Sequence, residues 1–206
     1  MDDEVYNPLD TKRLGEDVAR ELLERPLSPL PPPARFYGAG IYVIYYSGGF
    51  RPYSVLASAN GEGRFEVPIY IGKAVPKGHR KGSALLEPPR RTTALFDRLR
   101  VHARRITNSE NLRIEDFRCR YLVVEQVWVP LAEAILIERF HPLWNSLIDG
   151  FGNNDPGSGR YGQQLSRWDV LHPGRTWAQR LKPSRHDRAQ IEQEAAEFLA
   201  KRPWAP

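Results

Sequence analysis

The sequence of 206 residues has one cysteine and no long apolar run. A lone Cys119 excludes a disulfide framework and a cysteine-ligated zinc cluster, and it is typical of a reducing compartment. No apolar run approaches the roughly 18 residues of a membrane span. The acidic start MDDEVYNPLD does not have the apolar core of a signal peptide. We therefore expect a cytoplasmic protein with no membrane partner, and its length suits one domain.

The charge of the chain is unevenly distributed, although the formal net charge is only +5. Residues 1–30 carry eight acids and four bases, whereas residues 73–105 carry ten bases and two acids. A basic block of this density attracts phosphate groups before any base is read. The alternative interpretation is an ordinary solvated basic face.

Hydrophobic patterning predicts an ordered alternation of strands and helices. Strands are expected over 38–48, 64–74 and 117–128, and helices over 10–25, 92–106, 130–141 and 186–201. Residues 26–37 form a proline-rich arm, and residues 75–92 and 149–162 are expected to be loops. The predicted fold class is α+β, with a small mixed β-sheet flanked by helices.

Five short features occur in order along these elements. GIY at 40–42 and YIG at 70–72 lie on successive predicted strands. Arg98 and His102 follow on one face of a helix, Glu133 lies on the next helix, and Asn145 comes twelve residues later. Each tripeptide alone is a weak signal, but the five features in this order and context are a strong one.

Over residues 38–146 this constellation resembles the GIY-YIG nuclease superfamily. Longer strings are similar to the restriction endonucleases of that superfamily that cut GC-rich palindromes of the CCGCGG type: PLPPPARFYGAG (29–40), YIGKAVPKG (70–78), HPLWNSLIDGFGNNDPG (141–157) and WDVLHPGRTWA (168–178). The resemblance implies a single nuclease domain over 1–206. Its catalytic core would span 38–146, preceded by a helix and arm (1–37) and followed by a loop and C-terminal extension (147–206).

The resemblance further implies a prokaryotic type II restriction endonuclease that hydrolyses double-stranded DNA and leaves 5′-phosphate and 3′-hydroxyl ends. Its expected cofactor is one Mg²⁺ per active site, with Mn²⁺ as a substitute. A homodimer on DNA would match the two-fold symmetry of a palindrome, and a cognate DNA methyltransferase is the expected genetic partner. The alternatives are a non-catalytic DNA-binding module and a repair or homing nuclease of the same superfamily.

The expected catalytic residues are Tyr42, Tyr70, Lys73, Arg98, His102, Glu133 and Asn145. Tyr42 is the preferred base or water-positioning group, although Lys73 and His102 remain alternatives for removing the first proton. Arg98 is expected to clamp phosphate through its guanidinium fork. Glu133 is the expected metal ligand, preferred over Glu138 by its spacing to Asn145. Asn145 is expected to contact the phosphate or the metal shell.

Base contacts and dimerisation are expected in the proline-rich arm, in an insertion over 47–66 and in the 149–162 loop. A GC-rich site favours Arg or Lys bound to guanine O6 and N7. The candidates for DNA binding are Arg64, Lys77, Arg80, Arg104 and Arg160.

Overall fold

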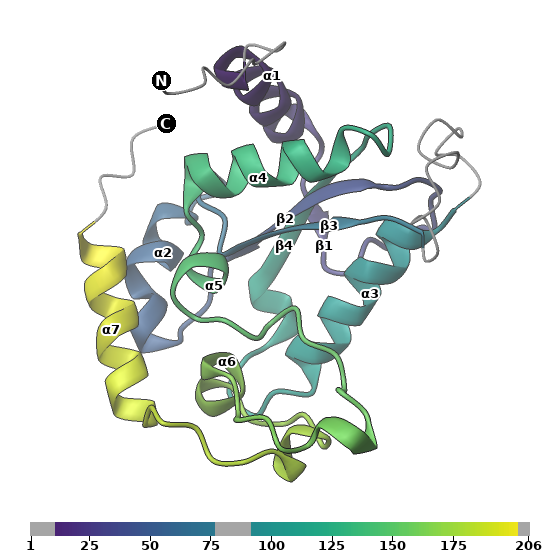
Figure 1. The fold of residues 1–206 in the computed structure, drawn as a ribbon. Coiled ribbons are helices and arrows are strands. Elements are labelled where there is room, and N and C mark those ends of the chain that lie inside the picture. Colours follow the sequence, from purple (N-terminus) through teal and green to yellow (C-terminus); the bar gives the residue numbers. More distant parts are fainter. Residues whose placement is uncertain (1–10, 77–91, 202–206) are drawn as a thin grey trace, which may run out of the picture.

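The computed structural model describes residues 11–76 and 92–201, in which a four-stranded sheet lies between two layers of helices (Figure 1). The strand order is β1-β4-β2-β3, and every pairing between these strands is antiparallel. The strands are β1 (Ser28–Pro29), β2 (Gly40–Tyr46), β3 (Tyr70–Ala74) and β4 (Phe117–Val123). None of the helices within the described ranges is long and apolar enough to cross a membrane.

The α-helices divide between the two faces of the sheet. Helices α1 (Thr11–Glu24) and α4 (Val129–Phe140) cover one face. The other face carries α3 (Ala94–Thr107), with α5 (Leu143–Ser146), α6 (Arg167–Leu171), α7 (Arg188–Ala200) and α2 (Ser54–Ala59) around it. Short 3-10 turns lie at Arg51–Tyr53, Ile114–Asp116, Ser158–Arg160 and Ala178–Arg180.

Strand β2 is buried along its whole length because helices cover both of its faces. Its sequence GIYVIYY is β-branched and aromatic without polar alternation, which is typical of a strand enclosed on both sides. Ile41, Val43 and Tyr45 pack towards α1 and α4. Tyr42 and its same-face neighbours pack towards α3 and the C-terminal helices. One central strand therefore joins the two hydrophobic clusters.

The α+β class is confirmed, and the sheet is antiparallel throughout the described strands rather than mixed. The four long helices begin and end within two residues of their predicted bounds. Strand β3 begins only at Tyr70, because Glu62 and Phe65 adopt positive φ and Pro68 cannot donate to a ladder. The predicted strand over 117–128 ends at Val123, where the chain turns into α4.

The 47–66 insertion is part of the folded core rather than a free excursion. It forms the 3-10 turn Arg51–Tyr53 and helix α2, which pack against α7 and bury Tyr53 and Leu56. Asn60, also fully buried, donates to the Tyr46 and Val67 carbonyls and accepts from the Val67 amide. The insertion thus fixes the end of β2 against the chain that leads to β3.

The glycines of GIY and YIG are required by close packing. A Cβ on Gly40 would overlap the Leu122 carbonyl of the neighbouring strand. A Cβ on Gly72 would lie 2.6 Å from Cζ of Tyr42, which pairs with Gly72 across the β2–β3 ladder. Gly72 therefore provides the space that the Tyr42 ring occupies.

We predict that Gly72→Ala lowers the free energy of unfolding by about 1–3 kcal/mol, because the added methyl group overpacks against the Tyr42 ring. Gly49 is exposed, and no described atom lies within 4 Å of the place a methyl group would take there, so Gly49→Ala is the matched control. It should change stability by less than about 0.5 kcal/mol. Urea unfolding of both variants checks this. Equal stability for the two would contradict the steric role of Gly72.

Candidate active site

A buried hydrogen bond joins the central strand to helix α3. The Tyr42 hydroxyl and Nε2 of His102 lie 2.6 Å apart, and both residues are 0% exposed. Tyr42 reaches this position because even-numbered side chains of β2 face α3, and His102 lies on the inner face of that helix. The sequence placed these residues in one site, and the structure brings them into contact.

Both members of this pair are neutral near pH 7. Burial, with the nearby Tyr70 hydroxyl, raises the pKa of Tyr42 well above 10.0 despite the opposing effect of Arg98. Burial, followed by the cations Arg98, Arg105 and Arg175, lowers the pKa of His102 well below 6.5. A neutral imidazole accepts through one nitrogen, so Nε2 of His102 can accept the Tyr42 proton.

A second tyrosine–histidine pair in the core provides a comparison. The Tyr53 hydroxyl lies 2.7 Å from Nε2 of His172, and Nδ1 of His172 lies 2.9 Å from Oδ1 of Asn111. Because a carbonyl oxygen only accepts, Nδ1 of His172 is the donor and Nε2 accepts from Tyr53. By contrast, the buried Nδ1 of His102 has no hydrogen-bond partner among the described residues. Six other buried side-chain polar atoms of the described residues, among them Nε of Arg175 and Nε1 of Trp168, also have no such partner.

Arg98 and Tyr70 form the half-buried part of the site. Arg98 lies one helical turn before His102, and its proximity to the Tyr42 and Tyr70 hydroxyls raises its pKa against the effect of burial. Its Nη2 atom donates to the Gly152 carbonyl at 3.3 Å. The rings of Tyr42 and Tyr70 lie 6.2 Å apart. A partly exposed guanidinium beside two phenols is suited to binding a phosphate.

Lys73 and Glu133 complete the site from the other side of β3. The Lys73 Nζ atom and Oε2 of Glu133 form an ion pair at 2.7 Å, with the Glu133 side chain 19% exposed. Lys73 faces α4 because it alternates with Tyr70 and Gly72 along the strand. Glu133 nevertheless raises the pKa of both Tyr42 and Tyr70. The ion pair and the tyrosines therefore lie on opposite faces of the sheet, near enough for Glu133 to influence both phenols, and β3 between them is an edge strand.

Glu133 fits the chemistry of a single-carboxylate metal ligand. A carboxylate has two oxygens and about four acceptor positions, so pairing with Lys73 leaves positions for a cation. Mg²⁺ is commonly held by one or two carboxylates together with water and substrate phosphate. Within 11–76 and 92–201, no group of three or more His, Cys, Asp or Glu side chains could hold a metal. Glu138, the alternative ligand, is exposed further along α4.

Asn145 binds the backbone of β3 through its side-chain amide. Its Oδ1 accepts from the Ile71 amide and its Nδ2 donates to the Ile71 carbonyl, both at 2.8 Å. These bonds satisfy the outer edge of β3, where another strand would otherwise pair. The Asn145 amide therefore binds the backbone of the YIG motif, and because these two bonds leave one Nδ2 hydrogen unused, the expected phosphate or metal contact stays a prediction.

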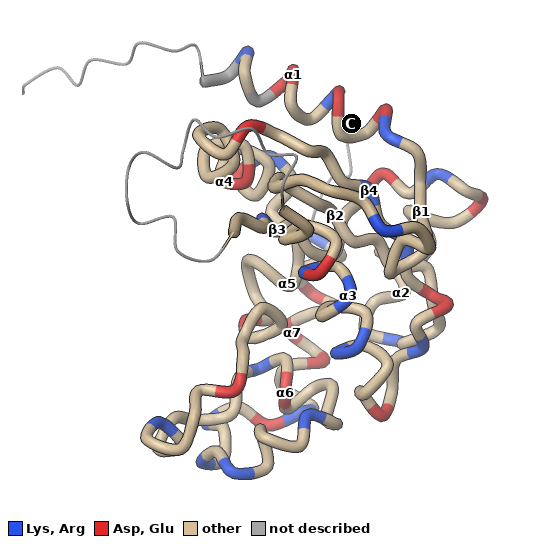
Figure 2. The backbone as a smooth tube through the Cα atoms, turned by 90° about the vertical axis from the view of Figure 1, so that its right-hand side faces the viewer, with Lys and Arg blue, Asp and Glu red and all other residues tan. Residues whose placement is uncertain are grey.

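The predicted DNA-binding residues are spread over several elements. Arg64 bonds within its own loop, to the Ser58 carbonyl and Glu62. Arg104 is exposed on α3, where basic residues recur (Figure 2), and Arg160 is exposed after the 149–157 loop. Lys77 and Arg80 lie outside the described residues.

The sequence analysis missed three residues beside the pair. Phe151 is fully buried and stacks on His102 with ring centroids 4.4 Å apart. Arg105 and Arg175 are 9% and 5% exposed and bind the loop that carries Phe151. Phe151 and Arg175 lie within two of the strings that carry the resemblance, 141–157 and 168–178, and Arg105 lies in the basic block over 73–105. Nothing in these local patterns indicates that the three residues meet beside His102.

The sequence model of a family described as the Eco29kI GIY-YIG domain matches residues 34–199, which is most of the chain. The match includes each residue of the site described above. A search of curated proteins finds no match.

We predict that Asn145→Ala lowers the free energy of unfolding by about 1–3 kcal/mol, because it leaves the Ile71 amide and carbonyl without partners. Asn108→Ala, at an exposed position, is the control and should be nearly neutral. Denaturant unfolding measures both. Equal effects would show that the edge contact of Asn145 adds no stability.

The buried histidines also predict how stability depends on pH. The pKa of His172 falls from 6.5 to about 3, mainly by burial. Between these values the unfolded chain binds a proton that the folded chain does not, so stability is lost as the pH falls below 6.5. This histidine contributes a slope of up to about 1.4 kcal/mol per pH unit. His172→Gln should flatten the dependence between about pH 6.5 and 4.5; an unchanged slope would contradict the assignment.

Proposed function

The chain belongs to the family of the Eco29kI GIY-YIG domain, a restriction endonuclease family, and on this premise we propose that it is a type II restriction endonuclease. Family membership makes it a hydrolytic nuclease that binds DNA. The finer proposal is cleavage of both strands at a GC-rich palindrome of the CCGCGG type, with 5′-phosphate and 3′-hydroxyl products, in the cytoplasm of a prokaryote.

The observation that carries this proposal is the buried Tyr42–His102 bond beside the half-exposed Arg98 guanidinium. Hydrolysis of a phosphodiester needs an acceptor for the proton of water, charge stabilisation on phosphorus and assistance to the leaving oxygen. The pair supplies the proton acceptor and Arg98 the phosphate contact. The Tyr70 ring lies beside the rings of Tyr42 and His102, so Tyr70 borders the position proposed for the phosphate.

We assign the first proton transfer to Tyr42 and His102 acting together. Tyr42 takes the proton of the attacking water as it passes its own to Nε2 of His102, which becomes a cation. The neighbouring arginines oppose that charge in the free protein. An anionic phosphate bound at Arg98 offsets them and makes His102 more basic, so substrate binding activates the pair. Lys73, an ammonium paired with Glu133, has no lone pair to accept a proton.

We propose one Mg²⁺ per active site, with Glu133 as its ligand from the protein and Mn²⁺ as a substitute. When bound, the ion would neutralise phosphate charge and support the leaving oxygen. Lys73 holds the Glu133 carboxylate beside β3 and lowers the cost of keeping that charge partly buried.

Recognition of a palindrome is proposed to use a homodimer on DNA, with one copy for each half-site. Arg160 lines an open polar hollow of about 320 Å³ with Asn153, Gln163 and Gln164. Arginine and amide side chains at such a position suit base edges in the major groove. Arg104 on α3 is proposed to contact the phosphate backbone. A cognate methyltransferase would protect the host genome from this activity.

We predict that the protein cuts plasmid DNA into discrete fragments with Mg²⁺, and that Glu133→Gln lowers the cleavage rate by about a thousandfold or more while DNA binding remains. Glu138→Gln, a matched change at an exposed position of the same helix, should cleave normally. Gel analysis of fragments and filter binding measure the two properties, and sequencing of the fragment ends identifies the site.

Two results would contradict parts of this proposal. Full cleavage by Glu133→Gln would remove the metal assignment. Binding of DNA by the unmodified protein with no cleavage in Mg²⁺ or Mn²⁺ would indicate a non-catalytic DNA-binding module instead.

A further inference from the structure

The loop after α5 covers the catalytic histidine. Phe151 of this loop stacks on His102 with an angle of 23° between the rings, and it meets the Tyr70 ring edge-on at 4.9 Å. Phe151 is 0% exposed. One loop side chain therefore shields His102 from water and lies against a second residue of the proposed site.

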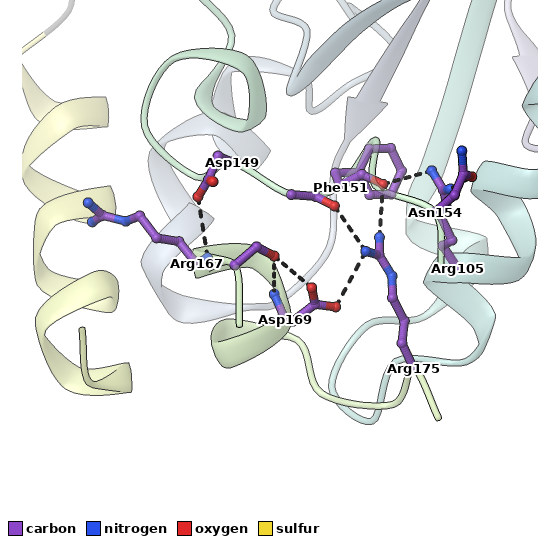
Figure 3. Close-up of polar contacts among 9 residues, drawn as sticks. Arg105, Asp149, Phe151, Asn154, Arg167, Asp169 and Arg175 are labelled. Carbon is purple, nitrogen blue, oxygen red and sulfur yellow. Dashed lines mark hydrogen bonds and ion pairs between the residues drawn. The ribbon is translucent and has the colours of Figure 1, made fainter. Parts of the chain in front are cut away.

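Two buried arginines hold this loop by its backbone (Figure 3). Arg105 of α3 donates from Nη1 to the Phe151 carbonyl at 2.8 Å and from Nη2 to Oδ1 of Asn154 at 2.6 Å. Arg175 donates to the Gly150 carbonyl at 2.9 Å and to the same Phe151 carbonyl at 2.8 Å. The carbonyl that precedes Gly152 is thus fixed from two sides, by groups that come from distant parts of the chain.

Anchoring a loop with two buried guanidinium groups costs free energy, because both charges lose hydration and repel each other. Two guanidinium groups are buried near each other, and their mutual repulsion adds to burial in lowering the pKa of Arg105 to about 10. Asp169 compensates Arg175 at 3.3 Å, and Trp168 stacks on it at 4.2 Å. The partners of Arg105 are neutral oxygens. Apolar packing would anchor a loop with less desolvation, so the location of these charges beside His102 calls for a functional explanation.

We propose that Arg105 and Arg175 are positioning residues of the active site, which fix residues 150–154 so that Phe151 closes over His102 and holds its imidazole in line with the Tyr42 hydroxyl. The inference rests on the proposed function, because it has the two arginines position His102 for the proposed proton transfer from Tyr42. Their bidentate geometry matters as much as their charge, since each guanidinium binds two acceptors at once.

The position of the loop controls how His102 responds to pH. The titratable and charged groups that face His102 come from four parts of the fold: Tyr42 of β2, Tyr70 of β3, Arg98 and Arg105 of α3, and Arg175 after α6. With the loop closed, burial and the three cations keep His102 neutral. A displaced loop admits water, so the pKa of His102 rises towards its ordinary value.

We test this with Arg105→Lys and Phe151→Leu. Lysine keeps the positive charge but lacks the planar fork with which Arg105 binds its two acceptors, and leucine keeps apolar volume but loses the stacked ring. Arg113→Lys makes the same change at an exposed position and is the control. Histidine ring resonances of the free protein are followed from pH 8 to pH 5, with His102 assigned by its loss in His102→Gln.

In the unmodified protein and in Arg113→Lys, the His102 ring should not titrate over this range. In Arg105→Lys and Phe151→Leu the loss of burial should raise the His102 pKa enough for the ring to titrate within this range. Single-turnover cleavage of bound DNA should fall about tenfold in both variants, with the DNA dissociation constant changed less than about twofold. A purely structural role would lower the melting temperature without moving the His102 titration.

An unchanged His102 titration and cleavage rate in the folded variants would overturn the proposal. If Arg105→Lys does not fold, Asn154→Ala removes one acceptor of Arg105 at an exposed position and must show the same changes in smaller measure. The titration needs no enzymatic activity. Failure of the unmodified protein to cut DNA would therefore reject the proposed function, while the titration would still decide whether the arginines position His102.

Discussion

The hydrogen bond between the Tyr42 hydroxyl and His102 is the contact on which the rest of the structure depends. It requires a tyrosine in the middle of a strand buried on both faces and a helix packed directly across that strand. It also requires Gly72 on the neighbouring strand, because any side chain there would occupy the space of the Tyr42 ring. The two tripeptide motifs therefore pack against each other: GIY supplies the Tyr42 ring, and YIG supplies Gly72, which leaves space for that ring.

The edge of the sheet is completed by side chains rather than by another strand. Asn145 bonds both backbone groups of Ile71, and Asn60 does the same for the chain between β2 and β3. An amide side chain presents an N–H donor and a carbonyl acceptor side by side, so it can bond both backbone groups of one residue as a neighbouring strand would. The Trp144 amide also donates to the Ile69 carbonyl at 3.0 Å, just before β3 begins, and Lys73 further along the strand is exposed.

Positive charge has two different locations in this molecule. Arg104 and Arg160, which are proposed to contact DNA, are exposed, where a charge loses little hydration. Arg105 and Arg175 are buried, where their charge is opposed by desolvation and acts on His102 instead. The comparison with Tyr53 and His172 makes the point: that pair is fully hydrogen bonded through Asn111, whereas the His102 pair keeps a nitrogen with no partner among the described residues and is surrounded by cations. The same two residue types form a fully hydrogen-bonded contact in one place and the proposed reactive pair in the other.

The sequence by itself determined the family, the long helices and the central strand, because these depend on local pattern and on spacing along the chain. It also predicted a site made of Tyr42, Tyr70, Lys73, Arg98, His102, Glu133 and Asn145. It could not determine that Asn145 caps the sheet edge, that the 47–66 insertion enters the core, or that Phe151 covers His102. Those facts depend on contacts between residues far apart in the chain. The sequence does not distinguish an arginine that lies in solvent from one that is buried beside a histidine. Only tertiary packing decides the burial of its guanidinium group and therefore its chemistry.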